Sequence, residues 1–209
     1  MARNSMAEEL NPYSWTGPVE AAGTEETDLE LLQRCRSDDH KVADMAFAGL
    51  VARYGPRLYR MVYRVLGDRF EAWDICQEAF VRAFTSLRKF DERLSFYTWL
   101  YRIGMNLTID ALRRRKVRRS VELADPDWFA SVQPPPDEIL ASSERAQHVQ
   151  EVLGRLPEKY RIVLVLRDME GFTPREMAKI LKLPSSLVRW RLHHARKLFK
   201  ELWGKRPDV

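Results

Sequence analysis

Residues 173–202 read TPREMAKILKLPSSLVRWRLHHARKLFKEL, and their pattern predicts two short helices joined by a tight turn. Thr173 and Glu176 have the spacing of a capping box, in which each side chain bonds the backbone amide of the other residue. A Lys-Leu-Pro sequence then interrupts the helix, and Ser185 or Ser186 can cap the next one. A short helix, a tight turn and a basic helix form the arrangement that places a recognition helix in the major groove of DNA.

The second of these helices has two distinct faces at about 100° per residue. One face is apolar and contains Val188, Leu192, Ala195, Phe199 and Leu202. The other face is basic or polar and contains Ser186, Arg189, Trp190, His193, Arg196, Lys197 and Lys200. A basic helix face often contacts only water, but the cap, the turn and the small serines favour DNA here. The segment therefore predicts sequence-directed DNA binding.

The composition of the 209-residue chain is that of a globular protein with a polyanionic partner. Hydrophobic residues make up 45% of the chain, enough for packed cores, and the sequence pI is near 9.3. No run of apolar residues predicts a membrane span and no signal peptide opens the chain, so we expect a cytoplasmic protein. Cys35 and Cys76 match no metal-ligand spacing, which favours buried thiols in a reducing compartment over a disulfide.

Charge and periodicity divide the chain into four parts. Residues 1–26 are acidic and aperiodic, which is typical of a flexible tail. Residues 113–119 contain six bases in seven positions, whereas residues 120–143 are acidic and Pro-rich and predict an extended linker. We therefore expect an all-α protein with one helical domain at 27–119 and a second at 144–209 that contains the helix-turn-helix.

Helical periodicity predicts four helices in the first domain. The pattern between residues 28 and 66 is helical, with a break at Gly55-Pro56 because proline disrupts a helix interior. The other expected helices span 68–87 and 95–119 in the first domain and 144–154 and 157–170 in the second. Helices of these lengths with one apolar face would pack as small bundles.

The helix expected at 95–119 carries aromatic and basic residues on one flank, which contains Trp99, Arg102, Asn106, Asp110 and Arg113. Rings that stack on unpaired bases and cations that hold the backbone are the chemistry of single-stranded nucleic acid binding. The competing interpretation places Trp99 and Phe96 in the core. We expect a core position for Phe96, and for Trp99 both interpretations stay open.

These segments together resemble the extracytoplasmic-function (ECF) sigma factors of bacterial RNA polymerase, over about residues 28–203. Four stretches carry the resemblance: EAWDICQEAFVRAF (71–84) resembles the core-polymerase-binding helix, SFYTWLYRIGMNLTIDALRRR (95–115) the promoter-melting helix, RLPEKYRIVLVLRDMEGFTPREMA (155–178) the entry to the upstream-element domain, and LVRWRLHHARKLFKEL (187–202) the recognition helix.

The resemblance implies a protein that binds core RNA polymerase, directs it to a promoter and helps to open the duplex. It implies no catalytic activity, no cofactor or metal and no small-molecule substrate. It implies as partners core polymerase, promoter DNA as duplex and as melted strand, and an anti-sigma protein, which in this group is often membrane-anchored. The linker at 120–143 would thread through the polymerase toward the RNA exit path.

Site residues follow from the same resemblance. Contacts to core polymerase would come from Asp74, Gln77 and Glu78. A second group of residues would bind the downstream element, the melted strand and a base flipped into the loop at 89–95. This group contains Lys89, Phe90, Trp99, Arg102, Asn106, Arg113, Arg114, Arg115, Lys116, Arg118 and Arg119. The upstream element would be bound by Thr173, Arg175, Ser185, Ser186, Arg189, Trp190, His193, Arg196 and Lys197.

Several positions depart from the family pattern. Gly104 stands where alanine is common and weakens its helix, which suggests a close contact at that position. Lys182 replaces a frequent glycine in the turn. The recognition helix begins Ser185-Ser186, and Trp190 replaces a small polar residue. The upstream DNA sequence that this helix recognises therefore cannot be inferred from the sequences that relatives recognise.

Two other functional classes compete with this one. A dimeric helix-turn-helix repressor or activator would bind its operator without polymerase, but it would not need the aromatic and basic flank of the first domain. A metal-dependent nuclease would need clustered carboxylates, and the carboxylates here are scattered. The four histidines, among them His193 and His194, form no recognisable ligand pattern.

Overall fold

The computed structural model describes residues 26–91, 95–121 and 144–204, and the elements in these ranges are helical, as the sequence predicts. The N-terminal domain consists of α2 (Asp28–Arg34), α3 (His40–Leu66), α4 (Arg69–Ser86), the 3-10 turn η2 (Leu87–Lys89) and α5 (Phe96–Val121). The C-terminal domain consists of α6 (Glu144–Arg155), α7 (Glu158–Leu164), the π-helical turn η3 (Val165–Met169), α8 (Pro174–Leu181) and α9 (Ser185–Trp203). The tail and linker predictions fall outside the described residues.

Side-chain caps set the helix starts in the N-terminal domain. Thr27 and Glu30 form a capping box on α2, and Asp39 and Asp68 accept from backbone amides at the starts of α3 and α4. Gly67 ends α3 at φ 73°, a left-handed conformation that residues with a Cβ rarely adopt. These local signals explain why the chain turns sharply between α3 and α4.

The break predicted at Gly55-Pro56 is wrong, because α3 continues through both residues as a single helix of 27 residues. Proline there lacks a donor and costs about 3 kcal/mol in a helix interior. Burial on both sides offsets this cost, since Leu50 and Leu58 are 0% exposed. The chain instead breaks between α2 and α3.

The predicted helix-turn-helix is confirmed in the C-terminal domain. Thr173 and Glu176 form the expected capping box on α8, and Lys182 ends α8 in the left-handed region at φ 53°. That conformation is easiest for glycine, so Lys182 takes up a backbone geometry that residues with a side chain rarely adopt. The serine cap predicted for α9 is wrong: Pro184 is the N-cap, and no side chain caps this end.

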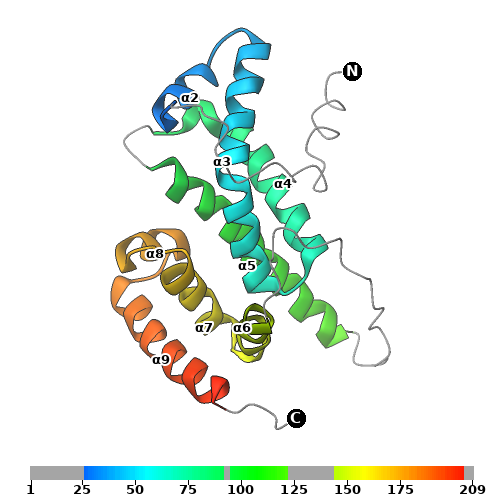
Figure 1. Ribbon diagram of the computed structural model, residues 1–209, viewed down its shortest axis with the longest axis vertical. Coiled ribbons are helices and arrows are strands. Elements are labelled where there is room, and N and C mark those ends of the chain that lie inside the picture. Colours follow the sequence, from blue (N-terminus) through cyan, green and yellow to red (C-terminus); the bar gives the residue numbers. More distant parts are fainter. Residues whose placement is uncertain (1–25, 92–94, 122–143, 205–209) are drawn as a thin grey trace.

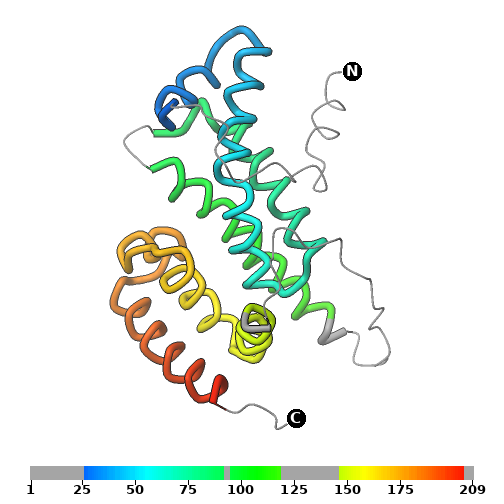
Figure 2. The backbone as a smooth tube through the Cα atoms, viewed as in Figure 1, coloured from blue at the N-terminus to red at the C-terminus, as the bar shows by residue number. Residues whose placement is uncertain are grey.

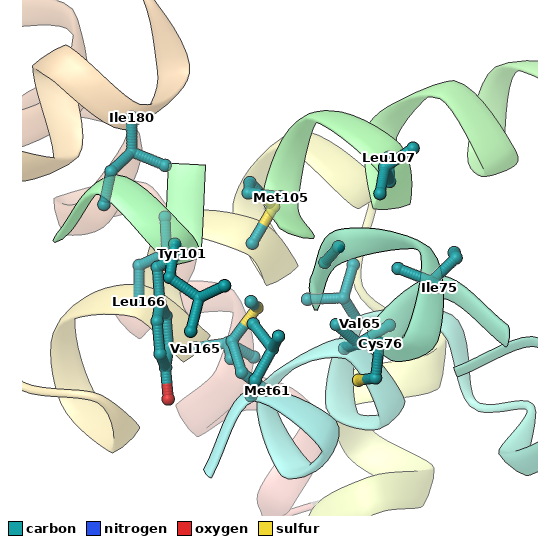
Figure 3. Packing of buried hydrophobic residues seen from close by; sticks show 14 of the residues in the cluster. Met61, Val65, Ile75, Cys76, Tyr101, Met105, Leu107, Val165, Leu166 and Ile180 are labelled. Atoms are coloured by element: carbon teal, nitrogen blue, oxygen red, sulfur yellow. The ribbon is translucent and has the colours of Figure 1, made fainter. Parts of the chain in front are cut away.

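The two domains pack against each other (Figure 1). In the ribbon, α3, α4 and α5 run side by side, and α6 to α9 lie along one side of α3 and α5. The tube in Figure 2 shows the same arrangement, with α8 beside the start of α5. The close-up in Figure 3 shows apolar side chains of both domains meeting, with Ile180 of α8 near Tyr101 of α5. One apolar cluster therefore runs through both domains.

Cys35 and Cys76 are free and buried, as expected for structural thiols. Burial raises the pKa of Cys35 to about 11 and also raises that of Cys76. Both thiols therefore stay protonated and unreactive near neutral pH. In the described ranges, no helix is both long and apolar enough to cross a membrane.

Gly104 makes the close contact that its presence in α5 suggests. A Cβ at this position would lie 2.8 Å from Cδ1 of Leu58, a side chain that is fully buried on α3. Glycine therefore lets α5 approach α3 more closely than alanine would.

We predict that Gly104→Ala lowers the free energy of unfolding by about 1–2 kcal/mol, because overpacking against Leu58 outweighs the gain in helix propensity. Gly154→Ala is the matched control, since an added Cβ there would meet no heavy atom within 4 Å apart from its chain neighbours and the backbone of its own helix. The control should raise the stability by up to about 1 kcal/mol. Urea denaturation of both variants measures the difference, and equal stabilisation by both would disprove the close contact.

Candidate nucleic-acid and polymerase interfaces

One face of α4 combines acidic and apolar side chains in contact with solvent. Asp74 and Glu78 are exposed, and Gln77 is half-buried between them, as the spacing predicts. Phe70 and Val81 extend the same face at helical spacing, and they are 45% and 52% exposed. The sequence analysis missed these two residues, although their i, i+4 and i+7 spacing to the acidic stripe could have indicated them. Two exposed apolar side chains therefore flank the acidic residues on this face of α4.

Three rings form a cluster where α5 begins. The ring centroids of Phe90 and Trp99 are 4.8 Å apart, and that of Phe96 lies 5.7 Å from Trp99. Phe96 is in the core, as expected. Phe90 was expected to contact DNA, but it is only 5% exposed because its ring fills the core beneath Trp99. Trp99 is partly buried, so it rests on the core and still reaches solvent.

The flank of α5 below this cluster is basic and open to solvent. Arg102 and Arg113 are exposed and Asn106 is half-buried, and Arg113 pairs with Asp110 at 3.3 Å on the surface. Farther along the helix the exposed cations are Arg114, Lys116 and Arg118. Lys89 is also exposed. The side chain of Arg119 and residues 92–94, in the loop expected to hold a flipped base, fall outside the described residues.

Arg115 differs from its neighbours in the basic run because it bonds within the protein. Its guanidinium pairs with Glu71 and, at 3.3 Å, with Asp68, and it donates to the carbonyl of Leu66 at 3.0 Å. It was expected to contact DNA, but these partners direct it toward the junction of α3 and α4. Its side chain is 29% exposed, which fits a residue that joins α5 to this junction.

A hollow of about 300 Å³ separates the α4 face from the basic run. It lies between the start of α4 and the end of α5, and its lining includes Phe70, Asp74, Arg114 and Arg118. Acidic and basic surfaces thus meet at one end of the N-terminal domain. A partner bound to α4 and a DNA backbone bound to α5 would be close neighbours here.

The outer face of α9 carries most of the side chains expected to bind the upstream element. The exposed ones are Thr173, Arg175, Ser186, Arg189, Trp190, His193, Arg196 and Lys197, while Ser185 is half-buried. Arg189 donates to the hydroxyl of Ser185 at 3.1 Å, so this serine orients the arginine instead of capping the helix. Trp190 is 49% exposed, a large ring presented to solvent.

Two side chains on α9 have roles that the sequence did not indicate. Arg196 makes a bidentate ion pair with Asp168 at 3.0 and 2.5 Å, so its guanidinium joins α9 to η3, and its DNA contact stays a prediction. The ring of His194 lies against that of Trp190, with centroids 4.2 Å apart and an interplanar angle of 37°, and its Nδ1 lies 3.1 Å from the carbonyl of Trp190. Since a carbonyl can only accept, Nδ1 donates, and this bond holds the imidazole against the indole.

Two sequence families match the chain. Sigma-70 region 2 matches residues 50–118, which include α4 and most of α5, and Sigma-70 region 4 matches residues 146–199, which include the helix-turn-helix. Among solved structures, CnrH in complex with the cytosolic domain of CnrY is 27% identical, with a TM-score of 0.63 over 86% of this chain and 98% of that one. RpoE of Bartonella quintana in complex with the anti-sigma factor NepR, 21% identical with a TM-score of 0.63, has the same fold.

Two bacterial sigma factors match the chain at higher sequence identity than these two solved structures. The ECF RNA polymerase sigma factor SigW of Bacillus subtilis is 32% identical over 83% of this chain and 97% of its own length. The ECF RNA polymerase sigma-E factor of Escherichia coli K12 is 33% identical over 81% of this chain and 91% of its own length. With both sigma regions present in order, the chain belongs to the ECF sigma factors of bacterial RNA polymerase.

Proposed function

We propose that this sigma factor uses three separate surfaces, one for polymerase and two for promoter DNA. The α4 face of Phe70, Asp74, Gln77, Glu78 and Val81 binds core polymerase. The outer flank of α5 binds the downstream element and the melted strand, and the outer face of α9 binds the upstream element. Membership of the family, which directs polymerase to promoters, removes the dimeric repressor as an alternative.

The proposal that α4 binds polymerase rests on one observation: this helix exposes acidic and apolar side chains on the same face. Phe70 and Val81 place two apolar side chains in water at the two ends of the acidic stripe. Binding would bury these two apolar side chains, and the carboxylates between them would provide orientation and partner choice. A cationic and apolar surface on the polymerase would complement it.

Promoter opening depends on Trp99 and the cations around it. The partly buried indole is supported from below by Phe90 and Phe96, so it is held rigidly at the surface. A rigid ring can stack on an unpaired base, while Arg102 and Asn106 hold the strand beside it. The exposed cations of the basic run would bind duplex phosphates next to the opened bases.

Upstream recognition depends on Arg189 and Trp190. An arginine can bond a guanine with two parallel hydrogen bonds, and Ser185 already orients this one. Trp190 has only a donor, so it contributes by packing on a thymine methyl or on the sugar-phosphate wall. The contact of the His194 ring with Trp190 limits where the indole can lie.

The chain acts through binding and leaves the chemistry of RNA synthesis to the polymerase, so it works in the cytoplasm with the chromosome. An anti-sigma factor is the remaining partner that we propose. The support for it comes from the solved relatives, of which one is in complex with the cytosolic domain of CnrY and another with the anti-sigma factor NepR.

We predict that the double variant Asp74→Lys/Glu78→Lys weakens binding to core polymerase about tenfold or more at physiological salt, because two favourable charge contacts become repulsive. The matched control is Asp38→Lys/Asp44→Lys, which makes the same charge change at exposed positions of the same domain. Titration of labelled chain with core polymerase measures both affinities. If the two double variants bind equally well, α4 is not the polymerase surface.

We predict that Arg114→Ala and Arg115→Ala have opposite consequences. Arg114→Ala should leave stability nearly unchanged and lower the log–log salt slope of promoter binding by the holoenzyme by about 0.9, because one phosphate contact is lost. Arg115→Ala should leave the slope unchanged and lower the free energy of unfolding by about 1–2 kcal/mol, because Glu71 and the Leu66 carbonyl lose their donor. A lower salt slope for Arg115→Ala would show that Arg115 contacts a DNA phosphate.

A further inference from the structure

The exposed indole of Trp190 is the first of three rings that form a continuous row on the C-terminal domain. The ring of His194 follows one helical turn along α9, and its centroid lies 4.2 Å from that of Trp190. The ring of Tyr160 on α7 lies 6.3 Å from both, at an angle of 14° to the imidazole. Trp190 is 49% exposed, and the other two rings are half-buried. The row therefore crosses from the recognition helix to its neighbour.

The start of α7, which carries Tyr160, is held in place by its surroundings. In Figure 1, α7 and α9 lie side by side, and buried apolar residues of both helices belong to the core cluster. Arg161 donates to the carbonyls of Gly154 and Leu156 at 3.0 Å each, which ties this start to the end of α6. Since packed interiors yield little, the ring of Tyr160 can move only slightly. It therefore limits the positions that are open to Trp190.

A cation ends the row on α7. The ammonium of Lys159 lies over the face of the Tyr160 ring, 5.0 Å from its centroid. Lys159 is exposed, and it forms no ion pair with a carboxylate in the described parts of the chain. A lysine ammonium has three donors, so its contact with the ring leaves it able to bind an anion. The row thus has a large exposed ring at one end and an uncompensated positive charge at the other.

The dimensions of this row suit the groove of a DNA duplex. The steps from Trp190 to Tyr160 and from Tyr160 to the Lys159 ammonium are 6.3 and 5.0 Å. The ammonium is therefore closer to the indole than the width of a major groove, which is about 12 Å. An indole that contacts a thymine methyl or the groove wall would bring this ammonium within reach of a phosphate at the groove edge. Lysine side chains supply many of the phosphate contacts that position a protein on DNA.

From this arrangement we infer that the surface for the upstream element extends from α9 onto α7. Tyr160 is a positioning residue, which together with His194 sets how Trp190 meets the DNA. Lys159 contacts a backbone phosphate beside the element. This inference rests on the proposed function, in which the outer face of α9 binds the upstream element. It adds residues that lie outside the helix-turn-helix of α8 and α9.

The two residues of α7 act on different properties of DNA binding. A phosphate has the same chemistry in every sequence, so Lys159 raises affinity without changing base preference. Tyr160 acts through the indole, so its loss affects only what Trp190 contributes. The two roles can therefore be tested separately.

The test of Lys159 is the salt dependence of promoter binding by the holoenzyme. Lys159→Ala should lower the log–log salt slope by about 0.9 and weaken all promoters alike, because one phosphate contact is lost. Lys159→Arg should keep the parent slope, since a guanidinium also binds phosphate. Lys41→Ala is the matched control, because Lys41 is exposed in the first turn of α3, outside the proposed surfaces. An unchanged slope for Lys159→Ala would overturn the phosphate contact.

The test of Tyr160 is the selection of upstream sequences by the holoenzyme from a randomised element. Tyr160→Leu should weaken binding to the preferred element several-fold, with any change in base preference confined to the positions that Trp190→Ala also affects. Tyr160→Phe should behave as the parent, because the ring remains. In a Trp190→Ala background, Tyr160→Leu should cause no further change, since the indole that it positions is gone. A parent-like Tyr160→Leu, or a further loss in the double variant, would overturn the positioning role.

The same measurements separate this inference from the proposed function. If Arg189→Ala and Trp190→Ala change neither the selected sequence nor the affinity, α9 does not bind the upstream element, and the proposed function fails. If they do change it while the variants of α7 behave as the parent, only the inference fails. Circular dichroism and thermal unfolding show whether Tyr160→Leu keeps the fold. Lys159→Ala alters an exposed side chain, so it tests the α7 surface even if Tyr160→Leu destabilises the domain.

Discussion

The buried stripe of α3 is the constraint on which the rest of the structure depends. Leu50, Leu58, Met61, Val62 and Val65 are 0% exposed along this one helix. Around it pack α2, α4 and α5 of its own domain and α6, α7 and η3 of the other. At 1.5 Å per residue its 27 residues extend about 40 Å, enough to serve both domains. An uninterrupted α3 therefore has to tolerate Pro56, and burial on both sides provides the compensation.

With α3 inside, the helices that carry function present their outer faces to solvent. The inward face of α5 packs through Tyr97, Tyr101 and Gly104, while Trp99 and Arg102 lie on the opposite flank. This division explains why the C-terminal domain can dock on α5 without covering its basic flank. The packing contact and the proposed DNA-binding flank therefore lie on different sides of the same helix.

Some local features of the C-terminal domain were predictable from neighbouring residues, although the serine cap expected on α9 was wrong. The capping box of Thr173 and Glu176 and the turn at Lys182 involve contacts within a few residues, and they were predictable from the sequence. The break placed at Pro56 was wrong because tertiary burial overrode a local penalty. Phe90 and Arg115 were expected to bind DNA because of the family resemblance, but their burial and ion pairs depend on residues brought together only by folding. The ion pair of Glu170 with Arg57 could not be recognised because the two residues lie 113 positions apart.

The most direct test of this account is transcription by purified core polymerase on a library of genomic fragments, with and without the chain, followed by mapping of RNA 5′ ends. The account predicts discrete new 5′ ends, preceded by two shared sequence elements at a constant spacing, because α5 and α9 bind the promoter at two places. The same 5′ ends with core polymerase alone, or new ends that share no such pair of elements, would contradict it.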